Sequence, residues 1–311
     1  MALDKLGIDG FRYADLHEPE RLAELATRFY QAVAEADADL AGAFARYAAG
    51  EALAPRDESS LIVRMAEHVG PFVARLFGVE READAERRAT VRYKAVFEFK
   101  KRFVKVRVHK KYGPDNPPAL TEREALARIS GALGAEPDDL ELAVATLALD
   151  LLAHEKALAD APDASADEQT EIGRTLEAIE ALCFHVAHAP HGDHGYDAWG
   201  SVRVPRPLDY QDLVPRERPF EDLPEISAAH EEHRRRRDGF GLTDRRMPLK
   251  LVMEEVDYCL YCHERDKDSC SKGFHEKTGG YRRNPLGIPL AGCPLDERIS
   301  EMHVLKREGH T

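Results

Sequence analysis

Four cysteines gathered near the end of the chain are the residues best suited to chemistry. They lie between residues 256 and 303 of a 311-residue chain that has five cysteines in all. The first two form a C-x-x-C pair, which lets two thiolates reach one metal centre from a single turn. Pro294 follows the fourth, and a Cys-Pro ending to a four-cysteine run is typical of iron–sulfur sites. The candidate cofactor and metal ligands are Cys259, Cys262, Cys270 and Cys293.

Three interpretations of these cysteines stay open. A [4Fe–4S] cluster is held by four thiolates, and four are present. A structural zinc ion takes four Cys, or Cys together with His, and three histidines lie nearby in the sequence: His263, His275 and His303. The third interpretation is a set of inert or redox-sensing thiols without metal. We favour the cluster, because four thiolates are present and Pro294 follows the last of them. In a reducing compartment, clustered cysteines also favour metal over disulfide.

The runs around the first and last cysteines also resemble a known protein domain. E-E-V-D-Y-C-L-Y-C leads into the site, and G-C-P-L-D-E-R-I-S-E-M-H closes it. Both runs are similar to the N-terminal iron–sulfur domain of the small-subunit glutamate synthase and dihydropyrimidine dehydrogenase family. That family has C-L-x-C, a third Cys, then G-C-P and an Ile. The matching positions here are Cys259, Cys262, Cys270, Cys293, Pro294 and Ile299.

The resemblance implies an electron-transfer module. In the family, the [4Fe–4S] domain is joined to an FAD- and NAD(P)H-binding module of the pyridine nucleotide-disulfide oxidoreductase type. This sequence departs from the pattern, because 22 residues separate Cys270 from Cys293, where the family has only a few. It also lacks the family's second cysteine set. We therefore expect the flavin module to lie on a longer parent chain or on a partner subunit.

No catalytic residues are predicted in this chain itself. It contains no dinucleotide-binding glycine loop, P-loop, G-x-S-x-G or H-E-x-x-H motif. The alternative function is a zinc-stapled helical scaffold that binds other proteins and has no redox activity. A cluster gives broad visible absorption, whereas zinc with its filled d shell is colourless, so the two are easily told apart.

Composition favours helices and argues against several classes of partner. Charged residues make up 32% of the chain and aromatics 7%, with a net charge of −13. Such an acidic chain is a poor non-specific ligand for nucleic acid. There is no basic start followed by an apolar run, and no stretch long enough to span a membrane. We expect a cytoplasmic location and neither nucleic-acid nor membrane partners.

The expected fold class is mainly α. We predict a helical domain at 1–198, a connector rich in proline and charge at 199–227, and a small helical, cysteine-rich iron–sulfur domain at 228–311. Proline at the start of a helix, the capping box of Thr121 with Glu124, and apolar stripes predict the helices. Seven of these helices are expected at 39–49, 59–77, 85–108, 121–131, 228–237, 247–259 and 295–306. Another is expected to begin at 19, another to begin after 137, and another to end near 188.

The inward-facing stripes are Val96, Phe99, Phe103 and Val106; Ile172, Leu176, Ile179 and Leu182; and Ile299, Met302 and Leu305. The alternation over 104–108 also allows a strand there, and Cys183 is interpreted as a small buried apolar residue.

Several further groups could take part in function. His185, His188, His191 and His194 recur every third residue, and a second metal site at these histidines is an open hypothesis. Three glycines are candidate N–H donors to a cluster, and three cations could offset its charge: Gly273, Gly287, Gly292, Lys267, Lys272 and Arg298. The basic run between Arg92 and Lys111 is interpreted as a solvated face that offsets acidic neighbours.

Overall fold

The structure is a computed structural model of the chain. It describes residues 5–160, 165–189, 199–204, 208–210, 213, 216–229, 238–241, 246–265 and 267–310. Within these residues it consists of helices joined by loops, with isolated β-bridges and no β-strand. The prediction of a mainly α fold is confirmed.

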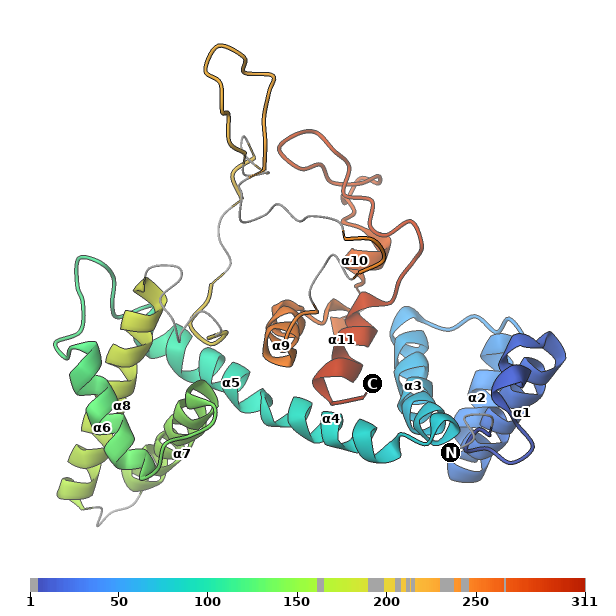
Figure 1. Cartoon of the computed structure of the whole chain (residues 1–311), viewed down its shortest axis with the longest axis horizontal. Coiled ribbons are helices and arrows are strands. Elements are labelled where there is room, and N and C mark those ends of the chain that lie inside the picture. The colour runs from blue at the N-terminus through green and yellow to red at the C-terminus, as the bar shows by residue number, and fades with distance from the viewer. Residues whose placement is uncertain are drawn as a thin grey trace.

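Three helices near the N-terminus form one end of the molecule (Figure 1). They are α1 (Pro19–Ala36), α2 (Ala38–Ala48) and α3 (Pro55–Phe77). Pro19 and Pro55 occupy the first helical positions, where their missing N–H groups leave no hydrogen bond unmade. The predicted start of α3 at Ser59 is wrong, because Pro55 begins the helix one turn earlier and Ser59 is buried inside it.

A long segment then crosses to the other end of the molecule (Figure 1). It was predicted as one helix, but it contains α4 (Glu80–Arg92), α5 (Lys94–Phe99) and the π-helix η2 (Lys100–Val108). In a π-helix each N–H bonds five residues back, and the His109 N–H donates to the Val104 carbonyl at 3.0 Å.

The π-helix changes which side chains face the core. An α-helical period places Val106 inside with Phe103, yet Val106 is 50% exposed, while Val104 and Val108 are buried. The wider turn moves the next inward position to Val108. The prediction that Val106 shares the buried face is therefore wrong, and so is the alternative of a strand over these residues.

Three further helices pack around this segment at the second end of the molecule. They are α6 (Glu122–Leu133), α7 (Leu140–Ala159) and α8 (Ala166–His188). The predicted capping box is confirmed, since the Thr121 hydroxyl accepts from the Glu124 N–H and the Glu124 carboxylate accepts from the Thr121 N–H. The predicted apolar stripe of α8 is confirmed as well, because all of its members are buried: Ile172, Leu176, Ile179 and Leu182.

The first residues after the predicted domain boundary are packed, which corrects the expectation of an extended connector there. Trp199 and Val202 are buried in the same core as α5 to α8. The backbone is held at both edges, because the Lys100 ammonium donates to the Gly200 carbonyl at 2.9 Å and the Ser201 N–H donates to Glu141 at 2.7 Å.

Four short helices carry the cysteine-rich part. They are α9 (Leu249–Tyr258), η4 (Cys262–Arg265), α10 (Ser269–Lys272) and α11 (Ile299–Arg307). Met253 and Val256 of α9 reach into the core of α5 to α8, so the predicted separate domain shares that core. The last helix begins at Ile299 rather than Leu295, and Met302, predicted to face inward, is exposed.

Ion pairs fasten the cysteine-rich part to the N-terminal helices. Helix α11 contacts α3, α4 and α9. Arg298 pairs with Glu58 of α3 at 2.8 Å, Lys306 with Glu86 of α4 at 3.6 Å, and Lys101 with Asp257 at 2.9 Å. Lys94 pairs with Glu308. The cysteine-rich part therefore sits against α3, α4 and α5 and does not hang freely from a linker.

None of the helices in the described ranges is both long enough and apolar enough to cross a membrane. The predicted helix at 228–237 lies almost wholly outside the described residues.

Candidate functional site

The first cysteine pair is placed by the end of α9. Cys259 is the residue that terminates the helix, and Cys262 opens η4. The sulfurs of both lie near one hydroxyl, that of Ser300 on α11, at 3.8 Å and 3.9 Å. Two thiols that share one small group must be close neighbours, as the C-x-x-C spacing predicted.

The loop between these two cysteines is tightly folded. Tyr261 has φ +47°, in the left-handed region that non-glycine residues rarely enter. Its N–H lies 3.4 Å from the Cys259 sulfur, and its hydroxyl donates to the Val256 carbonyl at 3.0 Å. The Arg307 guanidinium lies over its ring at 4.2 Å. These contacts hold the loop in a conformation that turns an N–H toward sulfur.

The second cysteine pair is joined through the backbone. Cys270 lies in α10, whose start is capped by the Asp268 carboxylate. The Cys293 N–H donates to the Cys270 carbonyl at 2.9 Å, and it also contacts the Ser271 carbonyl at 3.1 Å. The two cysteines are therefore adjacent although 22 residues separate them in the sequence.

Two glycines allow this close approach. Gly273 and Gly292 have φ of +80° and +82°. A Cβ on Gly273 would overlap the backbone of Leu290 and Ala291, and one on Gly292 would overlap Ser271 and Gly273. Any larger residue would force the two cysteine-bearing segments apart.

The electrostatics of Cys270 link it to the first pair. Burial raises the pKa of the Cys270 thiol, and the nearby negative charges of Cys262 and Cys259 raise that pKa further. Cys270 therefore lies within electrostatic range of Cys259 and Cys262, and Cys293 is joined to Cys270 through the backbone. Still, no three Cys, His, Asp or Glu side chains in the described ranges are already arranged as the ligands of one metal ion.

Two of the three glycines predicted as donors to a cluster already donate their N–H groups to backbone carbonyls. The Gly273 N–H donates to the Ser269 carbonyl at 3.1 Å, and the Gly287 N–H donates to the Asn284 carbonyl at 2.8 Å. Of the predicted cations, Lys272 pairs with Asp296 and Arg298 pairs with Glu58. Most of these groups stabilise the local fold, a role that spacing alone does not reveal.

The histidines that a zinc site would need differ in their contacts. The His275 ring bonds to the Lys272 carbonyl at 2.9 Å. His263 and His303 each have a buried Nδ1 without a hydrogen-bond partner, and burial lowers the pKa of His303. These two rings are the ones available to a zinc ion.

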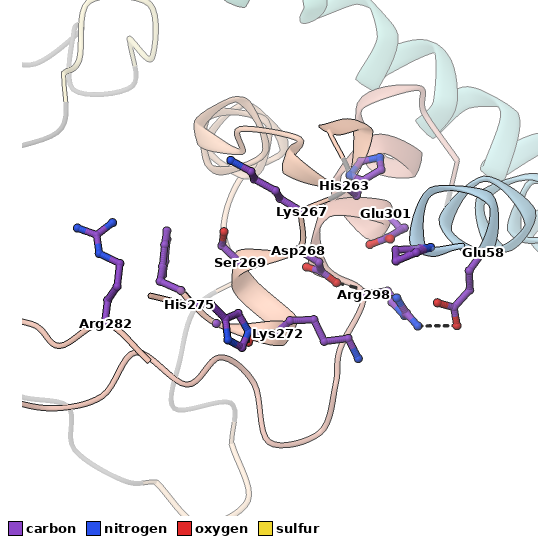
Figure 2. Close-up of a pocket in the computed structure, with 13 residues that line it drawn as sticks. Glu58, His263, Lys267, Asp268, Ser269, Lys272, His275, Arg282, Arg298 and Glu301 are labelled. Atoms are coloured by element: carbon purple, nitrogen blue, oxygen red, sulfur yellow. Dashed lines mark hydrogen bonds and ion pairs between the residues drawn. The ribbon is translucent and has the colours of Figure 1, made fainter. Parts of the chain in front are cut away.

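A cleft of about 450 Å³ lies where the cysteine-rich part meets α3 (Figure 2). Glu58 comes from α3, Arg298 immediately precedes α11, and Glu301 lies in α11. The Arg298 guanidinium points to Glu58, with Asp268 4.0 Å away on its other side. Arg298 therefore lies between two carboxylates and joins the two parts of the chain.

Two residues important to the site were missed by the sequence analysis. Ser300 gives no signal in the sequence, since a serine inside a helix is common. Glu58 lies 240 positions before Arg298, and only the packing of α11 on α3 pairs them. Cys183, predicted to be a buried apolar residue, is fully buried in α8, where burial raises its thiol pKa far above normal.

The two histidines described at the end of α8 bond to the backbone. His185 contacts the Leu120 carbonyl at 2.9 Å, and His188 contacts the Phe184 carbonyl at 2.8 Å. His191 and His194 lie outside the described residues. The idea of a second metal here therefore gains no support.

Comparison with known proteins finds a family model for the N-terminal helices and a relative of most of the chain. Residues 6–78 match a family model described as the RP005 N-terminal alpha-helical domain. The matched stretch ends at Gly78, the left-handed residue that terminates α3. The chain is also similar to Uncharacterized protein RP005 of Rickettsia prowazekii (strain Madrid E). The two are 22% identical over 270 residues, which cover 82% of each chain.

No solved structure matches the chain. The relatives support the helical nature of the N-terminal part and assign no reaction to the cysteines.

Proposed function

We propose that Cys259, Cys262, Cys270 and Cys293 hold a [4Fe–4S] cluster in an electron-transfer module. The proposal rests mainly on how the two cysteine pairs are placed. One pair shares the Ser300 hydroxyl, and the other pair is joined by the Cys293 N–H at 2.9 Å from the Cys270 carbonyl. When bound, such a cluster accepts and donates single electrons.

The residues around the cysteines suit that role. Hydrogen bonds to ligand sulfur and burial of the ligands are the means by which a protein sets the potential of a cluster. The Tyr261 N–H lies 3.4 Å from the Cys259 sulfur, and the Ser300 hydroxyl faces two sulfurs. Ser300 itself is fully buried, which keeps water from competing for the same contacts.

The electrons would pass to or from a module that binds FAD and NAD(P)H. This part of the proposal rests on the resemblance of the cysteine runs to the glutamate synthase small-subunit type. The flavin module would be a partner subunit or another part of a longer polypeptide, and the cytoplasm is the compartment we propose. The helical region at 1–198 would act as an adaptor or as an oligomerisation domain.

Anaerobic purification tests the site directly. We would compare wild type with Cys259→Ser and Cys293→Ser, and use Cys183→Ala as the matched control, because Cys183 lies in the α8 core. We expect broad visible absorption, with about four irons and four acid-labile sulfides per chain. Both site variants should lose them, whereas Cys183→Ala should keep them.

A colourless protein with stoichiometric zinc would contradict the electron-transfer role. It would favour the zinc-stapled scaffold, for which His263 and His303 offer buried, unpartnered nitrogens. Iron that survives in all three variants would instead mean that the cysteines are not the ligands.

A further inference from the structure

The segment between Cys270 and Cys293 is a folded arm, defined here as residues 272–290. Its base is closed by a ring of three backbone hydrogen bonds. The Phe274 N–H donates to the Leu290 carbonyl at 2.9 Å, the Leu290 N–H to the Arg282 carbonyl at 2.8 Å, and the Arg282 N–H to the Phe274 carbonyl at 2.8 Å. The arm therefore has a fixed base directly beside two candidate ligands.

Two tight turns complete the arm. Gly279 bonds back to the Glu276 carbonyl, with Gly279 and Gly280 both at positive φ. In the second turn the Asn284 carboxamide oxygen accepts from the N–H groups of Leu286 and Ile288, each at 3.0 Å. Asn-Pro-x-Gly is a strong turn sequence, because Pro sets φ and Asn caps the turn. The arm extends from α10 away from α3 and α4 (Figure 1).

The charge of the arm is opposite to that of the whole chain. The protein carries a net charge of −13, yet the arm has four basic residues and one acidic residue. Lys272 is engaged by Asp296 at the base. Lys277, Arg282 and Arg283 are exposed, and Arg282 has only a loose pair with Glu276 at 4.0 Å. The tip and sides of the arm therefore present positive charge.

Apolar and aromatic side chains lie among these charges. Four of them are 43–55% exposed: Phe274, Tyr281, Leu286 and Ile288. Aromatic residues and arginine are enriched in protein interfaces, and the arm exposes both kinds of side chain. This mixture is typical of a docking surface.

We infer that the arm is the docking surface for an acidic, one-electron-carrying protein partner. The inference rests on the proposed function, because the arm connects Cys270 to Cys293 and a protein seated on it would bring its redox centre beside the cysteines. Opposite charge guides such encounters and raises their association rate.

The test reverses the charge of the arm and leaves the cysteines unchanged. Lys277→Glu, Arg282→Glu and Arg283→Glu would be combined in one variant. The matched control combines Arg28→Glu, Arg81→Glu and Arg123→Glu, which are exposed residues of α1, α4 and α6 with the same total charge change. The probe partner is a flavodoxin, an acidic protein with one FMN.

Two measurements separate the arm from the cluster. Binding of flavodoxin is measured by calorimetry at low salt, and this readout does not need a cluster. Electron transfer from the reduced protein is measured by stopped flow with flavodoxin, and with a small neutral quinone as reference. We expect the arm variant to bind flavodoxin at least about tenfold more weakly and to reduce it at least about tenfold more slowly. Its affinity for flavodoxin should also depend less on salt concentration.

The control variant should match wild type within about twofold, and quinone reduction should be unchanged in all variants. Equal flavodoxin binding by wild type and arm variant, or none by wild type, would overturn the inference. Binding of a 20-nucleotide RNA in place of flavodoxin would overturn it too, and would make the arm a nucleic-acid contact. If the protein is colourless and only the arm variant loses flavodoxin binding, the proposed cluster is wrong and the docking surface is supported.

Discussion

At the scale of single residues, Lys100 shows how a charge can be used inside a core. Its side chain is 1% exposed, its ammonium donates to the Gly200 carbonyl at 2.9 Å, and it lies 4.8 Å from the Tyr258 ring centre. Burial lowers its pKa, while the charges of Glu254 and Asp257 partly oppose that effect. Lys100 therefore contacts both the 199–202 segment and α9, the helix that ends at Cys259.

We predict that Lys100→Met lowers the free energy of unfolding by about 1–3 kcal/mol at neutral pH, because the Gly200 carbonyl loses its donor. The difference between wild type and variant should grow as pH rises. The folded pKa lies below the unfolded value, so the unfolded chain binds more protons and wild-type stability increases up to the unfolded pKa. Urea denaturation at two pH values measures this.

Lys105→Met, an exposed residue of the same π-helix, is the control and should stay within about 0.5 kcal/mol of wild type. A Lys100→Met effect that does not change with pH would contradict the prediction.

Also at this scale, the glycines beside the cysteines should differ from those in open turns. Gly273→Ala and Gly279→Ala both place a side chain at positive φ, which costs about 1–3 kcal/mol, and Gly273, with ψ −176°, lies in a region that only glycine readily adopts. Only the Cβ at Gly273 meets backbone atoms, those of Leu290 and Ala291. We expect Gly273→Ala to destabilise further and to lower iron incorporation, measured by denaturation and metal analysis. Equal losses in both variants would show that the close approach has no effect.

At the scale of elements, the π-helix decides which valines are in the core. Val108 is buried and Val106 is half exposed. We therefore predict that Val108→Ala costs about 1–3 kcal/mol of unfolding free energy, since it leaves a cavity, whereas Val106→Ala stays within about 0.5 kcal/mol. Thermal and urea denaturation measure both. The reverse order would mean that these residues keep an ordinary α-helical register.

At the scale of the whole molecule, the pairing of α11 with α3 holds the two ends of the chain together. Arg298 and Glu58 lie 2.8 Å apart, with side chains 25% and 22% exposed. Burial of its side chain works to lower the pKa of Arg298, but the charge and hydrogen bond of Glu58, together with other nearby carboxylates, outweigh burial and raise that pKa. The Tyr47 hydroxyl also donates to Glu58, at 2.7 Å, so Glu58 serves two contacts at this junction.

A double-mutant cycle with Arg298→Met and Glu58→Gln should give a coupling of about 1 kcal/mol, at the upper end of the range for surface pairs, because this pair is partly buried. The more exposed Arg46–Glu51 pair, at 3.1 Å, is the control and should give about 0.2–0.5 kcal/mol. Urea denaturation followed by circular dichroism measures both cycles. Equal couplings would mean that α11 is not anchored through Arg298.

The sequence alone determined the features that depend on neighbours within about one helical turn. Thr121 with Glu124 fixed the start of α6, the apolar stripe fixed the inner face of α8, and C-x-x-C placed Cys259 beside Cys262. These signals are local, because capping and helical periodicity involve residues three or four apart.

Only the tertiary structure decided the features that join distant segments. The buried contact of Lys100 with Gly200 spans 100 positions, and the partly buried contact of Arg298 with Glu58 spans 240. The wide turn of η2, the burial of Trp199 and the approach of Ser300 to two sulfurs are of the same kind. Their partners are selected by packing of the completed core, where the free energy of burial outweighs local preference, so spacing in the sequence carries no trace of them.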